Sequence, residues 1–436
     1  MYGKKVKISS GHLPKSVTSI AINLVGLTSF CIAIFLIRKN SINSYLGAVI
    51  AGLAICIPII ILEFIRYKSF KNQSTGLDFS RKNDVNVRRV LIKLLGLFAT
   101  LALFSFFYWI IPEYHSDFYI NYWSLVKFLL PIIIIGAIPY FFILDRYLTE
   151  PQETYWQVGM IVLGKGKQVS KKGLKNHFLG WLVKAFYLPL MYTFLCGNIS
   201  FIKDNAPFLD VIVSHNFSSF FNYMNNFLFT IDLAWVFVGY LLTLRILDSH
   251  IRSVEPSFLG WFVAIQCYQP FWNMVSPGYY AYDDGYDWSQ WLSQIPELYI
   301  VWGTIILLLV GIYVWASVAF GLRFSNLTHR GILTNGPYRF MKHPAYVCKN
   351  LSWWLISIPF ISTVSIADAA QHCLLLLFLN FIYFMRARTE ERHLSKDPTY
   401  VQYGNVMNEV GIFKGLFKRI PALSYNAERY QNNKLF

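Results

Sequence analysis

The chain has 436 residues, of which 55% are hydrophobic, 18% are aromatic and only 14% are charged. So little charge excludes an ordinary water-soluble surface, and the composition predicts a polytopic membrane protein with the lipid bilayer as its surroundings. The formal net charge of +16 does not indicate nucleic-acid binding, because Lys and Arg concentrate in short segments between apolar runs, where membrane topology places them. We therefore expect no nucleic-acid partner.

Cysteine and histidine give no sign of a metal site. The six cysteines are dispersed, mostly in apolar runs, without Cys-x-x-Cys spacing, and the nine histidines do not pair at metal-ligand spacing on a helix. The basic N-terminus, MYGKKVKISSGHLPKS, precedes an apolar run without an obvious small-residue cleavage site. We interpret that run as a retained first membrane span.

Runs of about 20 apolar residues, long enough to cross roughly 30 Å of hydrocarbon, predict an all-α protein with about ten membrane helices. The seventh run is shorter than the six before it, and the last two, which are shorter still, form a predicted hairpin that is broken near Asp368. The expected spans are Val17–Ile37, Tyr45–Ile65, Val90–Ile111, Ser124–Leu148, Phe178–Ile202, Phe227–Ile246, Phe258–Val275, Leu298–Phe320, Leu351–Ile366 and His372–Met385.

The distribution of Lys and Arg orients these spans. The N-terminus and the segments after the second, fourth, sixth and eighth spans are basic, whereas those after the third, fifth and seventh spans have almost no Lys or Arg. This alternation places both termini, and the polar segment Gly321–Asn350, in the cytoplasm. The Lys-, Asn- and Ile-rich composition favours a bacterial inner membrane.

Three acidic residues lie in or at the ends of predicted spans, where ionised groups are costly. Glu63 has Arg66 one turn later and Asp145 has Arg146 beside it, so pairing at the membrane interface is the simpler interpretation of both. Asp232 has no such neighbour. It is either a buried hydrogen-bond acceptor or part of a transport path.

The polar residues with the strongest functional pattern lie in the last quarter of the chain. Asn335-Gly-Pro-Tyr-Arg-Phe-Met-Lys-His-Pro-Ala-Tyr346 precedes the hairpin, and Arg386-Ala-Arg-Thr-Glu-Glu-Arg-His-Leu394 and Asp397-Pro-Thr-Tyr-Val-Gln-Tyr403 follow it. A helix brings Arg386 near Glu390 and Arg388 near Glu391. A plain membrane anchor has no need for His-Pro, a double Glu and Tyr-x-x-Tyr together.

These motifs resemble the isoprenylcysteine carboxyl methyltransferase family, its bacterial relatives and the phospholipid methyltransferases, over about Arg323–Val410. The resemblance implies an S-adenosylmethionine-dependent membrane methyltransferase whose site faces the cytoplasm and whose lipid-like or prenylated acceptor arrives from the bilayer. Carried over position by position, the cofactor contacts fall on Tyr338, Lys342, His343, Pro344, Tyr346, Glu390 and Glu391. The predicted catalytic residues are His343, Glu391 and Arg386.

The residue types suit such a cofactor. A carboxylate of Glu390 or Glu391 can hold the ammonium or ribose, Lys342 or His343 the carboxylate, and Tyr338 or Tyr346 can stack. Lys342 stands where the family most often has Arg, so it offers a point charge and not a bidentate grip.

An amine acceptor must lose a proton, for which His343, His393 or a carboxylate is a candidate base, whereas a carboxylate acceptor needs none. Arg386 or Arg388 can orient an anionic acceptor or anchor the helix at the interface.

The sequence leaves two other functions open. A reductase that uses reduced nicotinamide adenine dinucleotide phosphate is one, because sterol reductases share a related C-terminal architecture. A non-enzymatic transporter or scaffold is the other. For the methyltransferase we expect two parts, an N-terminal membrane region of unknown role at residues 1–226 and a methyltransferase core at residues 227–436, with its motifs at 323–410.

Overall fold

The computed structural model describes residues 12–80, 84–166, 169–279 and 281–431. The basic residues before His12, and Arg81, Lys82 and Lys167 of the predicted basic connections, lie outside the described residues. Within the described chain the secondary structure is almost entirely helical, with one pair of two-residue strands, β1 (Ser253–Val254) and β2 (Thr328–His329), which pair antiparallel. The predicted all-α fold is confirmed.

Eight helical segments of the described chain are long and apolar enough to cross a membrane. Their composition and length make the protein a multi-pass membrane protein. They are α1 (Ile20–Lys39), α2 (Ser44–Leu62) with its π-helical end η1 (Glu63–Tyr67), α3 (Val87–Ile110), α4 (Ile120–Tyr147) with η5 (Asp117–Tyr119) before it, α6 (Lys171–Asp204), α8 (Phe217–Leu241), α12 (Pro296–Ala319) and α14 (Ile366–Leu394).

Two of the ten expected spans differ in the structure. The stretch Phe258–Val275 is not one helix but two short ones, α9 (Phe258–Ile265) and α10 (Phe271–Tyr279), separated at Pro270, which cannot continue a helix. The ninth span is α13 (Pro344–Ser357), whose 14 residues cover only about 21 Å. Because α14 already begins at Ile366 and has Asp368 in its first turn, the turn of the predicted hairpin lies before Asp368.

The remaining elements are short and connect the long helices or cover their ends. The other α-helices are α5 (Thr154–Val162), α7 (Phe208–Val213), α11 (Trp288–Leu292), α15 (Pro398–Val410), α16 (Lys414–Arg419) and α17 (Ala427–Gln431). The 3-10 turns are η2 (Ser69–Lys71), η3 (Gln73–Thr75), η4 (Pro112–His115), η7 (Arg245–Leu247), η8 (Gly321–Arg323), η9 (Gly336–Arg339) and η10 (Pro421–Leu423).

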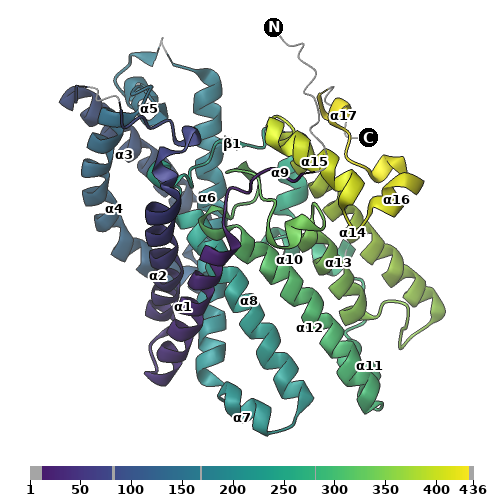
Figure 1. Cartoon of the computed structure of the whole chain (residues 1–436). Coiled ribbons are helices and arrows are strands. Elements are labelled where there is room, and N and C mark those ends of the chain that lie inside the picture. Colours follow the sequence, from purple (N-terminus) through teal and green to yellow (C-terminus); the bar gives the residue numbers. More distant parts are fainter. Residues whose placement is uncertain (1–11, 81–83, 167–168, 280, 432–436) are drawn as a thin grey trace.

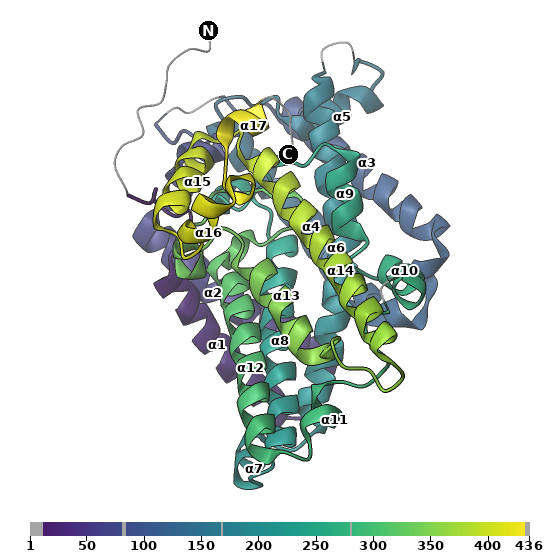
Figure 2. The same ribbon diagram turned by 90° about the vertical axis from the view of Figure 1, so that its right-hand side faces the viewer.

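Both ends of the described chain lie on the same side of the helix bundle. Helices α5, α15, α16 and α17 cover one end of the molecule, and α7 and α11 lie at the opposite end (Figures 1 and 2). Leu13, before α1, packs against a cluster that contains Tyr400 and Tyr403 of α15. This agrees with the even number of crossings that the charge pattern predicts; which side faces the cytoplasm stays a prediction.

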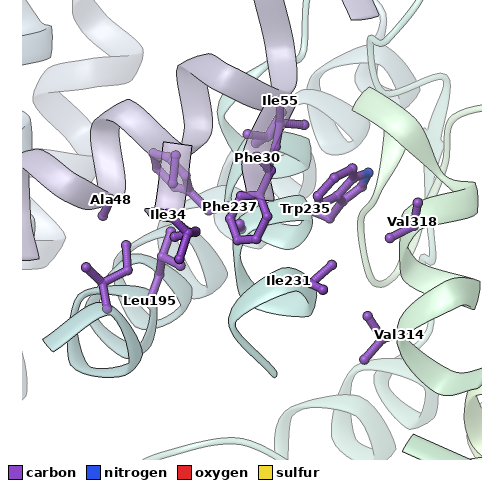
Figure 3. Packing of buried hydrophobic residues seen from close by; sticks show 14 of the residues in the cluster. Phe30, Ile34, Ala48, Ile55, Leu195, Ile231, Trp235, Phe237, Val314 and Val318 are labelled. Carbon is purple, nitrogen blue, oxygen red and sulfur yellow. The ribbon is translucent and has the colours of Figure 1, made fainter. Parts of the chain in front are cut away.

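One hydrophobic cluster joins helices from both halves of the chain (Figure 3). Phe30 of α1, Ile55 of α2, Leu195 of α6 and Trp235 of α8 are all fully buried there, next to Val314 of α12. The rings of Phe30 and Trp235 meet edge to face, with their centroids 5.9 Å apart. In a bilayer such close packing, and not release from water, holds helices together. The N-terminal helices therefore pack directly on α8 and α12, across the predicted boundary at residue 226.

Helices α3, α4 and α5 form a second packed group beside this cluster. A Cβ at Gly96 of α3 would lie 1.9 Å from the carbonyl oxygen of Tyr155, so only glycine permits this approach of α5. Asp145 of α4 is fully buried, with Oδ1 2.5 Å from Arg89 Nε and 2.9 Å from Lys93 Nζ, both on α3. The expected pairing with Arg146 is wrong, because the Asp145 carboxylate faces the neighbouring helix.

Glu63 also has a different partner from the one expected. Its carboxylate accepts two hydrogen bonds from the Arg323 guanidinium, at 2.8 and 3.1 Å, and both side chains are almost completely buried. Arg323 donates further to the carbonyl oxygens of Leu247 and Asp248. The expected pairing with Arg66 is wrong, because the buried Glu63 faces η8 and not its own helix surface. This ion pair fixes the start of the polar segment 321–350 to the N-terminal helices.

Candidate functional site

The His-Pro segment begins with a tight turn and ends as a helix. Gly336 has φ of +55°, a left-handed backbone that favours glycine, and it opens η9. Pro344 then occupies the first turn of α13, where its missing N–H costs nothing, with His343 at the N-cap position. The hydroxyl of Tyr403 on α15 donates to the carbonyl oxygen of Tyr338 at 2.8 Å and so fixes η9 to α15.

The carboxylate of Glu391 holds this segment against the end of α14. Its Oε1 lies 2.5 Å from Lys342 Nζ and 3.2 Å from His343 Nε2. Its Oε2 accepts from the Tyr430 hydroxyl at 2.5 Å and from Arg388 at 3.4 Å. The side chain is 3% exposed, so four neighbours enclose it. Two cations and two further donors satisfy this buried charge, which fixes three segments of chain to one another.

The adjacent carboxylate, Glu390, is in a different position. Its side chain is 40% exposed, and it accepts a hydrogen bond from the Tyr346 hydroxyl at 3.0 Å. The Nδ1 atom of His343 lies 4.0 Å away, and the rings of His343 and Tyr346 stack with their planes 4° apart. Burial and the charge of Glu390 raise the pKa of Tyr346 well above its usual value. The phenol therefore stays protonated and keeps donating to Glu390.

A cavity of about 1030 Å³, which includes space open to solvent, lies beside Glu390. Its walls come from α9, α12, α13, α14 and the loop 324–328, and a second cavity of about 540 Å³ shares Tyr338, Lys342 and Glu390 with it. Two buried hydroxyls on these walls, Thr328 Oγ1 and Tyr400 Oη, have no hydrogen-bond partner in the protein. These hydroxyls are free to bond to water or to a polar ligand in the cavity.

Arg386 contributes a positive charge to the same cavity. Its guanidinium is 5% exposed and lies 4.9 Å from the ring centroid of Tyr383, 5.1 Å from that of Tyr346 and 5.7 Å from that of Tyr268. It donates to Asn326 Oδ1 at 3.4 Å. In the described chain no carboxylate lies within 4 Å of it. Aromatic rings compensate part of its charge, and an anionic ligand would compensate the rest.

Arg388, two residues later, faces away from the cavity. Its guanidinium contacts Glu391, the hydroxyl of Tyr430 at 3.0 Å, the carbonyl oxygen of Ala422 and the ring of Phe384. It fixes the C-terminal segment to α14. The sequence left Arg386 and Arg388 as alternatives, and the structure gives them separate surroundings.

His393 lies on the cavity wall about two turns beyond Arg386. Its Nε2 is 2.8 Å from the hydroxyl of Ser253 in β1, and its Nδ1 is 3.9 Å from Glu255 Oε2. Glu255 also accepts from Arg392 at 2.9 Å. These contacts join β1 to the end of α14.

Most of the residues that the sequence singled out meet at this cavity. Tyr338, Lys342, His343, Tyr346, Arg386 and Glu390 line it, whereas Pro344 and Glu391 do not. Sequence reasoning missed the lining residues Tyr268, Tyr313, Asn326 and Lys349. Tyr268 and Tyr313 belong to stretches that had been interpreted as membrane spans, and a tyrosine inside an apolar run gives no local signal of a site.

Comparison with known proteins agrees with this geometry. Residues 298–396 match the sequence model of the isoprenylcysteine carboxyl methyltransferase family. The matched segment runs from α12 to the end of α14 and contains the His-Pro turn and both glutamates, so the predicted resemblance is confirmed. A search of curated proteins and a search of solved structures each gave no significant match. The family match and the eight candidate spans together support a membrane methyltransferase.

The described residues include no group of three or more His, Cys, Asp or Glu side chains that could hold a metal ion.

Proposed function

We propose that the protein is an integral membrane methyltransferase that uses S-adenosylmethionine to methylate a lipid-like or prenylated acceptor. The single observation that carries the proposal is the cavity beside Glu390. It brings together a part-exposed carboxylate, tyrosine rings and an arginine that has no acidic partner among the described residues, inside a segment that matches a methyltransferase family. We further propose that the protein lies in a bacterial inner membrane and that the cavity opens to the cytoplasmic side. The distribution of basic residues predicts this orientation.

The residues present suit the methyl donor. S-adenosylmethionine carries an ammonium, a carboxylate, ribose hydroxyls, an adenine ring and a sulfonium. Glu390 offers an acceptor for the ammonium, and Tyr346 and Tyr338 offer ring faces for the adenine or the cation. The unpartnered hydroxyls of Thr328 and Tyr400 offer hydrogen bonds to hydroxyl or carboxylate groups. When bound, the donor supplies an activated methyl group, and the protein aligns the acceptor and excludes water.

Glu391 acts on the site indirectly in this proposal. The Glu391 carboxylate holds Lys342 and His343 in place without lining the cavity itself. Lys342 therefore presents a neutralised ammonium to the cavity wall. We assign direct contacts to Tyr338, His343, Tyr346 and Glu390, and a positioning role to Glu391.

The acceptor is proposed to be lipid-like because the cavity lies between apolar helices. Helices α12 and α14 are both candidate spans, and their outer residues, such as Leu308 and Leu377, are exposed. Arg386 favours an acceptor that carries an anionic group, such as a prenylated cysteine carboxylate or a lipid phosphate. We retain residues 227–436 as the proposed core, with residues 1–226 as a region that supports it.

Calorimetry on detergent-purified protein tests the proposal. We expect S-adenosylmethionine to bind the wild type, and the exposed-surface variant Asp204→Asn to bind it equally. Tyr346→Phe, which removes the hydroxyl bonded to Glu390, should bind it more weakly. Binding of reduced nicotinamide adenine dinucleotide phosphate in place of S-adenosylmethionine would favour the reductase, and binding of neither in detergent or lipid would contradict an enzyme of either kind.

A further inference from the structure

The cavity has a deep end that the proposed donor contacts do not use. Tyr313 of α12 lies six residues, or about 9 Å, before the end of its helix, and Lys349 lies five residues, or roughly 7 Å, inside α13. Tyr383 lies seven residues, or about 10 Å, before Glu390 on α14. All three side chains line the cavity. The cavity thus extends from the helix ends toward the middle of the bundle.

Asp232 lies directly behind this deep end. It is on α8 and 5% exposed, and its Oδ2 accepts a hydrogen bond from the Tyr313 hydroxyl at 2.5 Å. Its Oδ1 is buried and makes no hydrogen bond of normal geometry, although the Ser317 hydroxyl lies nearby. No cation of the described chain lies within 4 Å of this carboxylate. A carboxylate in a membrane helix is costly, so the hydrogen bond that joins α8 and α12 does not by itself explain why this position is an aspartate.

Positive charge lies on the cavity side of the pair. The Lys349 ammonium is 5.4 to 5.9 Å from the ring centroids of Tyr313, Trp353 and Tyr383, and Arg386 lies against Tyr383. The groups that face Tyr313 are therefore Asp232 behind it and Lys349, Tyr268 and Tyr383 around it. Two cations repel an ammonium and stabilise an oxyanion.

We propose that this deep end is the acceptor subsite and that the Tyr313–Asp232 pair takes a proton from an acceptor hydroxyl of the phenol type. Lys349 stabilises the oxygen anion that forms. The inference rests on the proposed function and narrows it. A carboxylate acceptor has no proton to lose, so Asp232 would have no proton to accept. A protonated amine acceptor would bring a third cation beside Lys349 and Arg386.

The transfer balances in atoms and charge. The O–H bond of the acceptor and the S–CH₃ bond of the methyl donor break, an O–CH₃ bond forms, and the electron pair of the S–CH₃ bond stays on sulfur. The acceptor proton passes to the Tyr313 oxygen while the Tyr313 proton passes to Asp232. Tyr313 is the group that touches the acceptor, and Asp232 acts through it.

A chromophoric phenol tests the proton transfer without any methyl donor. The probe is an alkylated para-nitrophenol, whose visible absorbance reports whether the bound phenol has lost its proton. We expect the wild type to lower the apparent pKa of the bound probe. Lys349→Met should raise that bound pKa by about one unit, a tenfold change in ionisation. Asp232→Asn and Tyr313→Phe should each leave a smaller fraction of the bound probe ionised at a given pH, because each removes a group that takes up its proton.

Two matched controls separate this role from folding. Asp204→Asn removes an exposed carboxylate, and Tyr299→Phe removes a hydroxyl from the same helix as Tyr313, outside the cavity. Both should leave the bound pKa of the probe and the unfolding temperature unchanged. An Asp232→Asn protein that is as stable as the wild type and ionises the probe equally would overturn the inference.

Methyl transfer assays distinguish failure of the inference from failure of the proposed function. S-adenosylmethionine should bind the Asp232→Asn variant as tightly as the wild type, because Asp232 lies outside the proposed donor contacts. Transfer to a prenylated phenol should fall by at least tenfold in that variant. If the wild type binds the donor but methylates only a farnesylated cysteine or phosphatidylethanolamine, and Asp232→Asn does so equally, the inference fails and the methyltransferase stands. If the donor does not bind at all, the proposed function itself fails, and the inference with it.

Discussion

Two adjacent carboxylates, Glu390 and Glu391, are expected to respond differently to the same substitution. One variant should lose stability and the other should lose affinity for the methyl donor. Glu391→Gln removes the charge that faces Lys342 at 2.5 Å and His343 at 3.2 Å, in a site where the lysine side chain is 6% exposed. Breaking a buried pair by removing one partner costs about 3–5 kcal/mol. Because an unfolding entropy of about 2.1 cal/mol/K per residue amounts to about 0.9 kcal/mol per kelvin for 436 residues, each kcal/mol shifts the unfolding temperature by about 1 °C, and we expect a drop of about 3–5 °C.

Glu390→Gln leaves the packing intact because its side chain is 40% exposed and has one hydroxyl donor. It removes a charge-assisted hydrogen bond to the ligand, which is worth about 1.5–3 kcal/mol. Since 1.4 kcal/mol corresponds to about tenfold in affinity, S-adenosylmethionine should bind about 10- to 100-fold more weakly.

Thermal unfolding and calorimetry on the same two preparations measure both effects. Glu391→Gln should lose stability, and Glu390→Gln should lose donor affinity at an unchanged unfolding temperature. The distinction between a positioning and a contacting glutamate is refuted if Glu391→Gln unfolds at the wild-type temperature, or if Glu390→Gln binds the donor normally.

Three further substitutions test buried or half-buried charges. Glu63→Leu should destabilise the protein by about 3–5 kcal/mol by leaving Arg323 unpaired, and adding Arg323→Met should recover most of the loss in thermal unfolding; a double variant as unstable as the single one contradicts this. The His329 imidazole, whose Nε2 lies 3.2 Å from Asp397 Oδ2, lowers the pKa of Asp397 to about 2. Because this is below the unfolded value of about 3.9, the stabilisation is complete above about pH 4 and disappears as the pH falls through about 2. The unfolding temperatures of wild type and Asp397→Asn should differ near pH 7 and converge near pH 2, and a constant difference would argue against the pair. Arg386→Met should weaken binding of an anionic lipid acceptor while S-adenosylmethionine affinity, measured by calorimetry, is unchanged; equal loss of both would place Arg386 at the donor.

The helical fold was predictable because apolar runs of span length have few alternatives in a membrane. The limits of prediction appear where a run is interrupted. Pro270 divides the expected seventh span, and α13 begins at Pro344 within the motif and not at the start of the apolar run. Length and hydropathy alone do not distinguish such short helices from crossings, because both are apolar.

The candidate site was predictable as far as its motifs are local. His343, Tyr346 and Glu390 meet because a short turn and two helix ends bring them together. The roles of the two glutamates could not be separated in sequence, because which one faces the cavity depends on the rotation of α14 relative to α13. Likewise Glu63 and Arg323 are 260 positions apart, and only the packing of α2 against η8 reveals their ion pair.

The most direct test of the central claim is transfer of a labelled methyl group from S-adenosylmethionine to lipids extracted from the source membrane. Wild-type protein in bilayer vesicles should form an organic-soluble labelled product, and Glu390→Gln, which keeps the fold, should form at least tenfold less at a limiting donor concentration. A folded wild-type protein that binds the donor and transfers no label to any lipid, prenylated cysteine or prenylated phenol would contradict the account.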